Sequence, residues 1–346
     1  FIIFVLHGFQ DFNPRTGDLI NMGQFEPILQ EKKDKFVIFP VKHHDIWDWY
    51  KKVENNFWTA EEIDLHQDLN DWNNKLNANE RFFIKHLLAF LPSSNAIVKQ
   101  NLSGNFLNEV QYPEAHCFFA FQISMENIHS ETYSLLFDTY TKEEKEKYQI
   151  FKETEVLPGV QKKASWVQKW QNSDSFAERL VAFAAVERIS FAGAFCSVSW
   201  LKKRNLLPGF TFANELISRD KEVFSDFAVH LHNHHLINKI SSAQIRKIVI
   251  DALEIEKEFI TKSLPASLLG LNAIYLNQYL EFVADGLLLD LECELEYGST
   301  NPFDFIATTN SPEKSTILEK RVGELQKAGL MNKDNDVTKF RFNKKL

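Results

Sequence analysis

Residues 125–133 read Met-Glu-Asn-Ile-His-Ser-Glu-Thr-Tyr, and three of their side chains have helical spacing. Glu126, His129 and Tyr133 stand at i, i+3 and i+7, so a helix presents all three on one face. A Glu and a His one turn apart can hold one metal ion. In metal-binding helical bundles, two such pairs and one carboxylate from each of two further helices surround two metals. One pair alone arises often by chance, and a helix without any ligand role is the alternative.

The sequence around this stretch favours an all-α chain. Its 346 residues are 44% hydrophobic, which is enough to bury an extensive core. Only 12 glycines and 10 prolines occur, and long stretches contain neither, which favours long helices. Apolar residues recur at spacings of three and four, and this pattern predicts helices over 76–111, 113–140, 175–203, 209–236, 242–263 and 268–290.

Three pairs with Ser or Thr followed three positions later by Glu are typical of capping boxes at helix starts: Thr59/Glu62, Thr141/Glu144 and Ser175/Glu178. The short Leu-Pro-Gly loops at 157–159 and 207–209 indicate antiparallel neighbouring helices. We expect an irregular leader over 1–25, one helical domain over 26–310 and a flexible tail over 311–346.

Charge and cysteine content exclude several classes of protein. The net charge of −8 argues against a nucleic-acid-binding surface, which needs a concentrated basic face. The apolar opening Phe1–Leu6 is far shorter than a membrane span and lacks the features of a signal peptide. Three widely spaced cysteines favour free thiols in a reducing compartment, so we expect a cytoplasmic protein without a membrane partner.

Two further patterns are interpreted as structural. His230, His232, His234 and His235 form a local cluster near a predicted helix end, with no carboxylate or Cys at metal spacing in the sequence. A solvated surface is therefore favoured over a zinc site. No Ser/His/Asp arrangement, phosphate-binding loop or glycine-rich dinucleotide turn appears, so hydrolase and nucleotide-binding functions have no support.

Several segments resemble the eukaryotic small subunit of class I ribonucleotide reductase in their order and spacing. They are residues 57–62, 125–133, 181–187, 214–220, 281–285 and 301–305. The resemblance covers residues 35–330. It implies a ferritin-like helical bundle with additional helices, two irons and a stable tyrosyl radical. In that family the radical is passed to a large subunit that reduces nucleotides for deoxyribonucleotide biosynthesis and DNA replication.

The resemblance assigns family positions to six residues of this chain. Metal-ligand positions hold Glu126, His129 and Glu187, the radical position holds Tyr133, and the electron-transfer path begins with Trp58 and Asp220. The other three ligand positions differ from the family, because they hold Asn95, Lys221 and Phe224. The chain is thus similar to a ligand-deficient paralogue, and we expect no metal or at most one metal ion.

A charge count offers one account of such a site. Glu126 and Glu187 contribute −2, and Lys221 and Arg188 contribute +2 if both point inward, which would balance the pocket without metal. An Arg188 that faces solvent is the alternative. Tyr133 is then expected to be a buried, hydrogen-bonded core tyrosine that carries no radical.

The expected exit of the radical path also departs from the family. Leu325 stands where the family has a relaying tyrosine, and the chain ends in a basic segment instead of an acidic one. We therefore expect a subunit that is not catalytically competent alone. Its expected partners are an active small subunit, in a heterodimer, and the large subunit. Two alternatives stay open, which are an oxidoreductase with one metal and a non-catalytic homodimer with a regulatory role.

Overall fold

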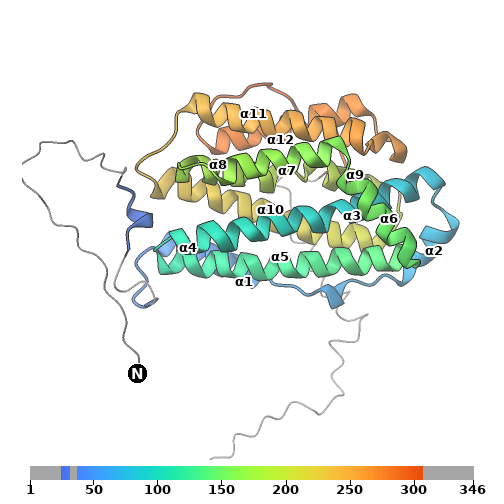
Figure 1. The fold of residues 1–346 in the computed structure, drawn as a ribbon, viewed down its shortest axis with the longest axis horizontal. Coiled ribbons are helices and arrows are strands. Elements are labelled where there is room, and N and C mark those ends of the chain that lie inside the picture. Colours follow the sequence, from blue (N-terminus) through green and yellow to red (C-terminus); the bar gives the residue numbers. More distant parts are fainter. Residues whose placement is uncertain (1–24, 32–36, 307–346) are drawn as a thin grey trace, which may run out of the picture.

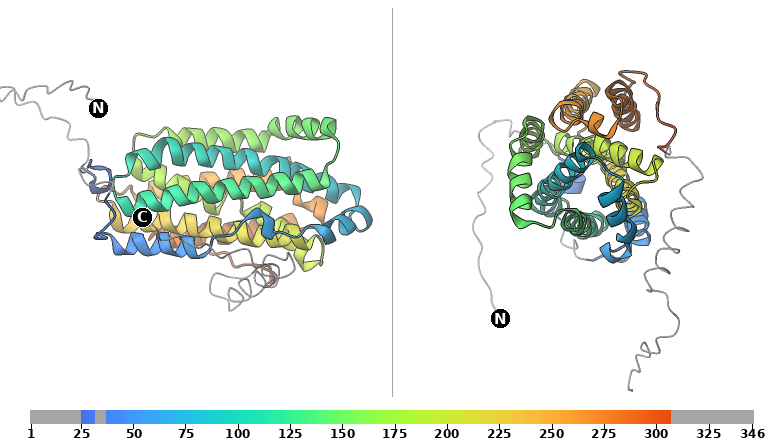
Figure 2. Two further views of the ribbon diagram at one scale, coloured as in Figure 1. Left: turned by 90° about the horizontal axis from the view of Figure 1, so that it is seen from below. Right: turned by 90° about the vertical axis from the view of Figure 1, so that its right-hand side faces the viewer.

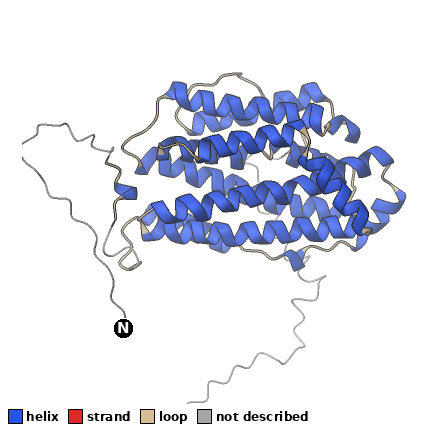
Figure 3. Cartoon of the chain, in the orientation of Figure 1, coloured by secondary structure: helices blue, strands red, loops and turns tan. Residues whose placement is uncertain are grey.

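The computed structural model describes residues 25–31 and 37–306, and every structural statement below refers to them. Within these ranges the chain is helical and contains no strand (Figure 3). The predicted all-α, ferritin-like bundle with additional helices is therefore confirmed. The predicted leader up to residue 24 and the tail over 311–346, including Leu325, lie outside the described residues.

Twelve α-helices are assigned in these ranges. They are α1 (His44–Asn55), α2 (His66–Asn74), α3 (Ala78–Asn101), α4 (Leu107–Glu109), α5 (Pro113–Tyr140), α6 (Glu144–Glu155), α7 (Pro158–Gln171), α8 (Phe176–Arg188), α9 (Ala192–Lys203), α10 (Pro208–His235), α11 (Ser242–Glu258) and α12 (Ala273–Asp290). Shorter turns are the 3-10 segments η1 (Pro27–Leu29), η2 (Ala60–Glu62) and η5 (Ala266–Leu269), and the π-helical segments η3 (Leu102–Phe106) and η4 (Phe259–Ser263).

The helices α3, α5, α8 and α10 run along the long axis of the molecule and enclose the core, and α3, α5 and α10 are the longest described helices (Figures 1 and 2). In this group α3 packs against α5, and α8 packs against α10. The other helices cover these four, with α1 along α5 and α10, α6 and α7 against α3, and α11 and α12 beside α8. The helices that carry the predicted site residues, α3, α5, α8 and α10, thus all face the centre of the bundle.

Most predicted helices occur close to their predicted limits, with differences at their ends. The 76–111 helix continues past α3 through the π-helical segment η3 and the short α4. The 268–290 helix begins later, at Ala273, because Gly270 adopts the left-handed φ of 84° and Asn272 caps the new start. The Asn272 side chain accepts a 2.8 Å hydrogen bond from the Ile274 N–H.

The predicted single helix over 175–203 is wrong, because the chain breaks between α8 and α9. A buried ion pair from two other helices holds the break in place. Lys163 on α7 donates a 2.5 Å hydrogen bond to the Ser190 carbonyl and pairs with Glu256 on α11. The other oxygen of Glu256 accepts the Gly193 N–H at 3.0 Å. The break therefore depends on residues far away in the sequence.

The three predicted capping boxes have three different outcomes. The Thr59/Glu62 box is confirmed at η2. At α8, Ser175 accepts the Glu178 N–H, but the Glu178 carboxylate accepts a hydrogen bond from Ser173, so only half of that box forms. The Thr141/Glu144 box is wrong, because Glu143 occupies the N-cap position of α6.

The start of α10 and the loop after it are tied to distant segments by buried carboxylates. Asp68 on α2 accepts the Gly209 and Phe210 N–H groups at 2.8 Å, which satisfies buried N–H groups in the first turn of α10. Glu26, only 5% exposed, accepts the N–H groups of Ile237 and Asn238 in the loop after α10. Glu26, which precedes α1 in the sequence, is thus part of the folded bundle.

One segment, Phe176–Lys203, is long and apolar enough to cross a membrane by length and composition alone. Its most apolar window is 83% buried inside the bundle. Burial against α7, α10 and α11 explains this apolar character as that of a core element.

Candidate functional site

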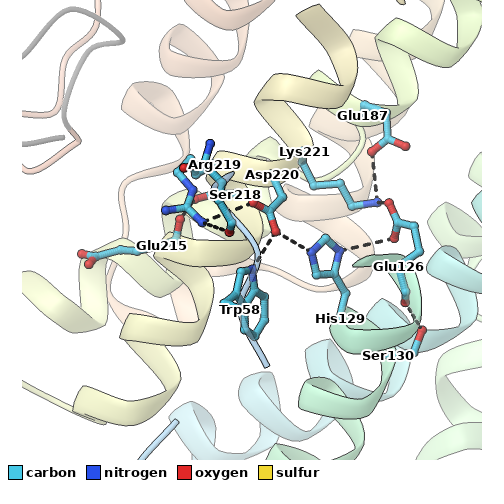
Figure 4. A network of polar contacts seen from close by, with 11 residues as sticks. Trp58, Glu126, His129, Ser130, Glu187, Glu215, Ser218, Arg219, Asp220 and Lys221 are labelled. Atoms are coloured by element: carbon cyan, nitrogen blue, oxygen red, sulfur yellow. Dashed lines mark hydrogen bonds and ion pairs between the residues drawn. The ribbon is translucent and has the colours of Figure 1, made fainter. Parts of the chain in front are cut away.

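The predicted site residues of three helices meet in the centre of the bundle (Figure 4). Glu126 and His129 come from α5, Glu187 from α8, and Asp220 and Lys221 from α10. All five are buried, with at most 6% of any of them exposed. The helical spacing of the Glu-x-x-His pair therefore does place both side chains at one interior site.

Lys221 lies between the two glutamates. Its Nζ is 2.8 Å from Glu126 Oε1 and 3.0 Å from Glu187 Oε2, and its side chain is 1% exposed. The Nζ also lies 4.7 Å from the centre of the Phe191 ring. The pKa of Lys221 is raised, because attraction to Glu126 and Glu187 outweighs the opposing effect of burial. The lysine therefore carries its charge at neutral pH.

The two glutamates differ in how strongly their charged forms are stabilised. Burial raises the pKa of Glu126, but Lys221 and His129 together lower it below the ordinary value. Burial dominates at Glu187, whose pKa is raised despite the attraction to Lys221. Gln122, one turn before Glu126, donates a 3.3 Å hydrogen bond to Glu187 Oε1. Sequence reasoning missed Gln122, although its i, i+4 spacing to Glu126 was a usable signal.

A second group of buried polar contacts joins His129 to Asp220 and Trp58. Asp220 Oδ2 accepts a 2.7 Å hydrogen bond from Trp58 Nε1 and lies 3.0 Å from His129 Nε2. The Trp58 and His129 rings are stacked at a centroid distance of 5.8 Å. Burial lowers the pKa of His129, but Asp220 and Glu126 raise it above the ordinary value. The structure thus brings Trp58 and Asp220, the two residues expected at the start of the electron-transfer path, together with His129.

Two directions were open for the Arg188 side chain, and the one that would balance the charges of the glutamates is not adopted. Arg188 pairs with Asp226 and Asp290 instead. A different cation lies near the site, since Arg219 Nη2 is 3.4 Å from Asp220 Oδ1. With His129 protonated, the three carboxylates Glu126, Glu187 and Asp220 face three cations, Lys221, His129 and Arg219.

Tyr133 is buried one turn beyond His129, with 2% of its surface exposed. Its pKa is raised well above the ordinary value, first by burial and then by the charges of Glu126, Glu187 and Asp220. The expected hydrogen bond of its phenol is absent, because the hydroxyl has no partner among the described residues. The charges of the three carboxylates therefore act on Tyr133, but its hydroxyl forms no hydrogen bond with any of them.

The remaining two altered positions are also buried. Asn95 on α3 is 0% exposed, and neither polar atom of its amide has a hydrogen-bond partner in the described part of the chain. Phe224 on α10 is 1% exposed, with its ring centroid 6.2 Å from that of His129. A phenyl ring offers no lone pair to a metal.

The residues present do not fit the pair of irons that the resemblance implies. Glu126, His129 and Glu187 remain as donors, but an ammonium group stands within hydrogen-bonding distance of both glutamates. Two cations would need further carboxylates and a second imidazole, and the chain has Asn95, Lys221 and Phe224 at those positions.

A cleft of about 740 Å³ between α8, α9, α10 and α12 reaches this site from the surface. Glu187 and Lys221 are among the residues that line it, together with Asp226, His230 and His234. Arg188 also lines the cleft. The glutamate–lysine pair therefore borders this cleft, although each of the two residues is only 1% exposed.

The histidine cluster has a carboxylate that sequence reasoning missed. Asp45 of α1 lies beside His230 and His235 at the end of α10, and its Oδ2 is 2.7 and 2.6 Å from their Nε2 atoms. Sequence separation hid Asp45, because it precedes His230 by 185 positions.

Comparison with known proteins identifies the family. The profile described as "Ribonucleotide reductase, small chain" matches residues 35–302. The ribonucleoside-diphosphate reductase small chain of Neurospora crassa is 56% identical over 309 residues, covering 89% of this chain and 75% of that protein. Its Vaccinia virus (strain Ankara) counterpart is 51% identical over 312 residues, covering 90% and 97%.

A solved structure supports the same assignment. The structure of the ribonucleotide reductase Rnr4 homodimer from Saccharomyces cerevisiae is 40% identical, covers 87% of this chain and 93% of that chain, and superposes with a TM-score of 0.77. The resemblance found in the sequence is thus confirmed. This chain belongs to the small-chain family of ribonucleotide reductase, the oxidoreductase that makes deoxyribonucleotides.

Proposed function

We propose that this chain is a metal-free small subunit of ribonucleoside-diphosphate reductase, which supports an active, metal-bearing small subunit in a heterodimer. In this role it is not catalytically competent alone. It acts in the cytoplasm and contributes to deoxyribonucleotide synthesis through the complex with the large subunit.

The position of Lys221 carries this proposal. Its ammonium group pairs with Glu126 at 2.8 Å and with Glu187 at 3.0 Å, where it does electrostatically what a bound cation would do. Isolated buried carboxylates are costly, and pairing with a buried lysine offsets that cost. The bundle can therefore fold around this site without waiting for metal.

The preserved scaffold supports a role as a partner. The four central helices and the Trp58–Asp220–His129 contacts are in place, although the donor set is incomplete. A chain that keeps the family's shape can present the family's docking surfaces to another small subunit. All three cysteines are free, which agrees with the proposed cytoplasmic location.

Metal content after loading tests the first part of the proposal. The purified chain is incubated with ferrous iron and O2, and iron per chain is measured with the electron paramagnetic resonance spectrum. We expect no iron at the buried site and no tyrosyl radical signal. About two irons per chain together with a radical would overturn the proposal.

A rebuilt site tests why metal is absent. In the triple variant Asn95→Asp, Lys221→Glu and Phe224→His, three missing donors return, and we expect iron binding to appear. The matched control is Lys221→Met, which removes the ammonium without adding a donor and is expected to stay iron-free. Iron binding by the control alone would show that Lys221 blocks an otherwise adequate donor set.

Partner choice is tested separately. The chain is co-expressed with an active small subunit of the same organism, only one of them tagged, and the complex is analysed by native mass spectrometry. A one-to-one heterodimer is expected, with higher iron and radical content per active subunit than without this chain. Exclusive recovery of homodimers would contradict the proposed partnership.

One observation favours a second candidate function, an oxidoreductase with a single metal. Glu126 Oε2 and His129 Nδ1 are buried without hydrogen-bond partners among the described residues, and they lie 3.4 Å apart. A rotation of Lys221 would leave these atoms and Glu187 available to one ion. About one tightly bound metal per chain at the buried site would favour this alternative.

A further inference from the structure

A separate group of potential metal ligands lies where α1 meets the end of α10. Asp45, His230 and His235 each offer one ligand atom, and these atoms all lie within 4.8 Å of one another. The carboxylate oxygen Oδ2 of Asp45 is 2.7 Å from His230 Nε2 and 2.6 Å from His235 Nε2. Both imidazoles thus converge on one oxygen atom.

The distances suit a transition metal after small side-chain movements. Zinc binds imidazole nitrogen and carboxylate oxygen at about 2.0–2.2 Å, so two ligand atoms of a tetrahedral site are about 3.4 Å apart. The distances from Asp45 Oδ2 to the two imidazole nitrogens are shorter than this by less than about 1 Å, a difference that rotation of the aspartate side chain can supply. Two histidines and one carboxylate also leave positions for water.

The surroundings favour a cation and allow it to enter. Asp45 is 46% exposed, and the side chains of His230 and His235 are 18% and 12% exposed, so the group is reachable from solvent. His235 is the last residue of α10, and the C-terminal end of a helix carries partial negative charge. His234 lies alongside, with its ring centroid 4.7 Å from that of His230.

We propose that Asp45, His230 and His235 form a surface site for one divalent transition-metal ion of the zinc and cobalt type. The ion cross-links α1 to the C-terminal end of α10. Its ligands come from positions 45, 230 and 235, and none belongs to the buried glutamate site. The proposal is independent of the proposed function.

The consequence for the fold is local. Without metal, Asp45 holds both histidines through hydrogen bonds that solvent can replace, since it is half exposed. With metal, the same three side chains form coordinate bonds that fix α1 on α10. A ligand that binds only the folded chain raises its unfolding temperature with concentration.

The test titrates Co2+ and then Zn2+ into the chelator-treated, full chain. Equilibrium dialysis gives the number of ions bound, and the visible absorption of Co2+ reports nitrogen and oxygen coordination. We expect one ion per chain, visible absorption that Zn2+ removes, and a higher unfolding temperature with Zn2+. The double variant His230→Gln/His235→Gln and the single variant Asp45→Asn should each bind at least tenfold more weakly.

His44→Gln is the matched control, because His44 is an exposed neighbour of Asp45 outside the group. It should bind as the unmodified chain does. Failure of the unmodified chain to bind either ion, retained binding by the double variant, or equal loss in the control would each overturn the proposal. The double variant also serves the iron-loading experiment, since any iron it retains is held elsewhere, and the two proposals can fail separately.

Discussion

The bundle contains two buried lysine–carboxylate groups, and they differ in how completely their polar atoms are satisfied. Lys163 pairs with Glu256, and this pair also binds the Ser190 carbonyl and the Gly193 N–H. Lys221 pairs with Glu126 and Glu187, yet beside it Glu126 Oε2 and His129 Nδ1 form only a long ion-pair contact of 3.4 Å with each other among the described residues.

The difference separates a structural ion pair from an altered ligand site. Both lysines lie near a phenylalanine ring, at 4.3 Å from Phe259 for Lys163 and 4.7 Å from Phe191 for Lys221. Only the first pair holds a chain break in place. Buried polar atoms without well-formed hydrogen bonds cost free energy, so we expect the Lys221 group to stabilise the fold less than the Lys163 group does.

The largest expected effect is on stability at the structural pair. Lys163→Met leaves the Glu256 carboxylate buried without its cation and removes a hydrogen bond to Ser190. We expect a loss of about 3–5 kcal/mol in the free energy of unfolding, measured by urea denaturation.

Lys162→Met is the matched control, because Lys162 forms an exposed pair with Glu258 and is 52% exposed. Its loss should stay within about 1 kcal/mol. Equal decreases in the free energy of unfolding of Lys163→Met and Lys162→Met would contradict a stabilising role for the Lys163–Glu256 pair.

A smaller loss is expected at Lys221. Lys221→Met removes the cation between two glutamates, but burial already raises the pKa of Glu187, so that carboxyl can take up a proton. We expect a loss of about 1–3 kcal/mol. Adding Glu187→Gln to Lys221→Met should recover part of it, and no recovery would contradict the neutralising role of Lys221.

Unlike Lys163→Met and Lys221→Met, Tyr133→Phe is not expected to destabilise the chain. The Tyr133 hydroxyl is buried without a partner among the described residues, so its removal abolishes an unsatisfied polar group. We expect stability to be unchanged or to rise by about 1 kcal/mol. A loss above about 1 kcal/mol in thermal or urea unfolding would reveal a partner that holds the phenol.

The smallest effect is on the alkaline pH dependence of stability. Burial lowers the pKa of Lys163 below its usual 10.5, although Glu256 opposes the shift. Between the lowered pKa and 10.5 the unfolded chain binds more protons than the folded one, so this residue makes unfolding less favourable as pH rises. As the pH rises toward 10.5, the free energy of unfolding of the unmodified chain should increase by less than about 1 kcal/mol relative to that of Lys163→Met. A decrease in this difference as the pH rises would show that the pKa of Lys163 is raised and not lowered.

The long helices of the fold could be predicted from apolar spacing, and α5 was predicted from end to end. The break between α8 and α9 could not, because the apolar pattern continues through it and the stabilising residues Lys163 and Glu256 come from α7 and α11. The spacing of apolar residues indicates which face of a single helix is buried, whereas a break in a helix depends on contacts with other helices.

For the site, the positions of its residues could be predicted from the sequence, but the directions of its long side chains could not. Spacing and resemblance located Glu126, His129 and Glu187, and they do meet. The direction of a long side chain could not be derived from the sequence, since Lys221 points inward while Arg188 pairs with Asp226 and Asp290. Asp45 was missed for a related reason, because only the folded chain brings it to His230.

The contacts of Glu26 affect where this protein can be cut and joined in hybrid proteins. The family profile begins at residue 35, yet Glu26 binds the loop after α10, and the Ile28 carbonyl accepts the Gln111 N–H at 2.7 Å. A chimaera joined at residue 35 would lose both contacts and uncover the end of α10. A junction before residue 25 keeps the swapped module whole.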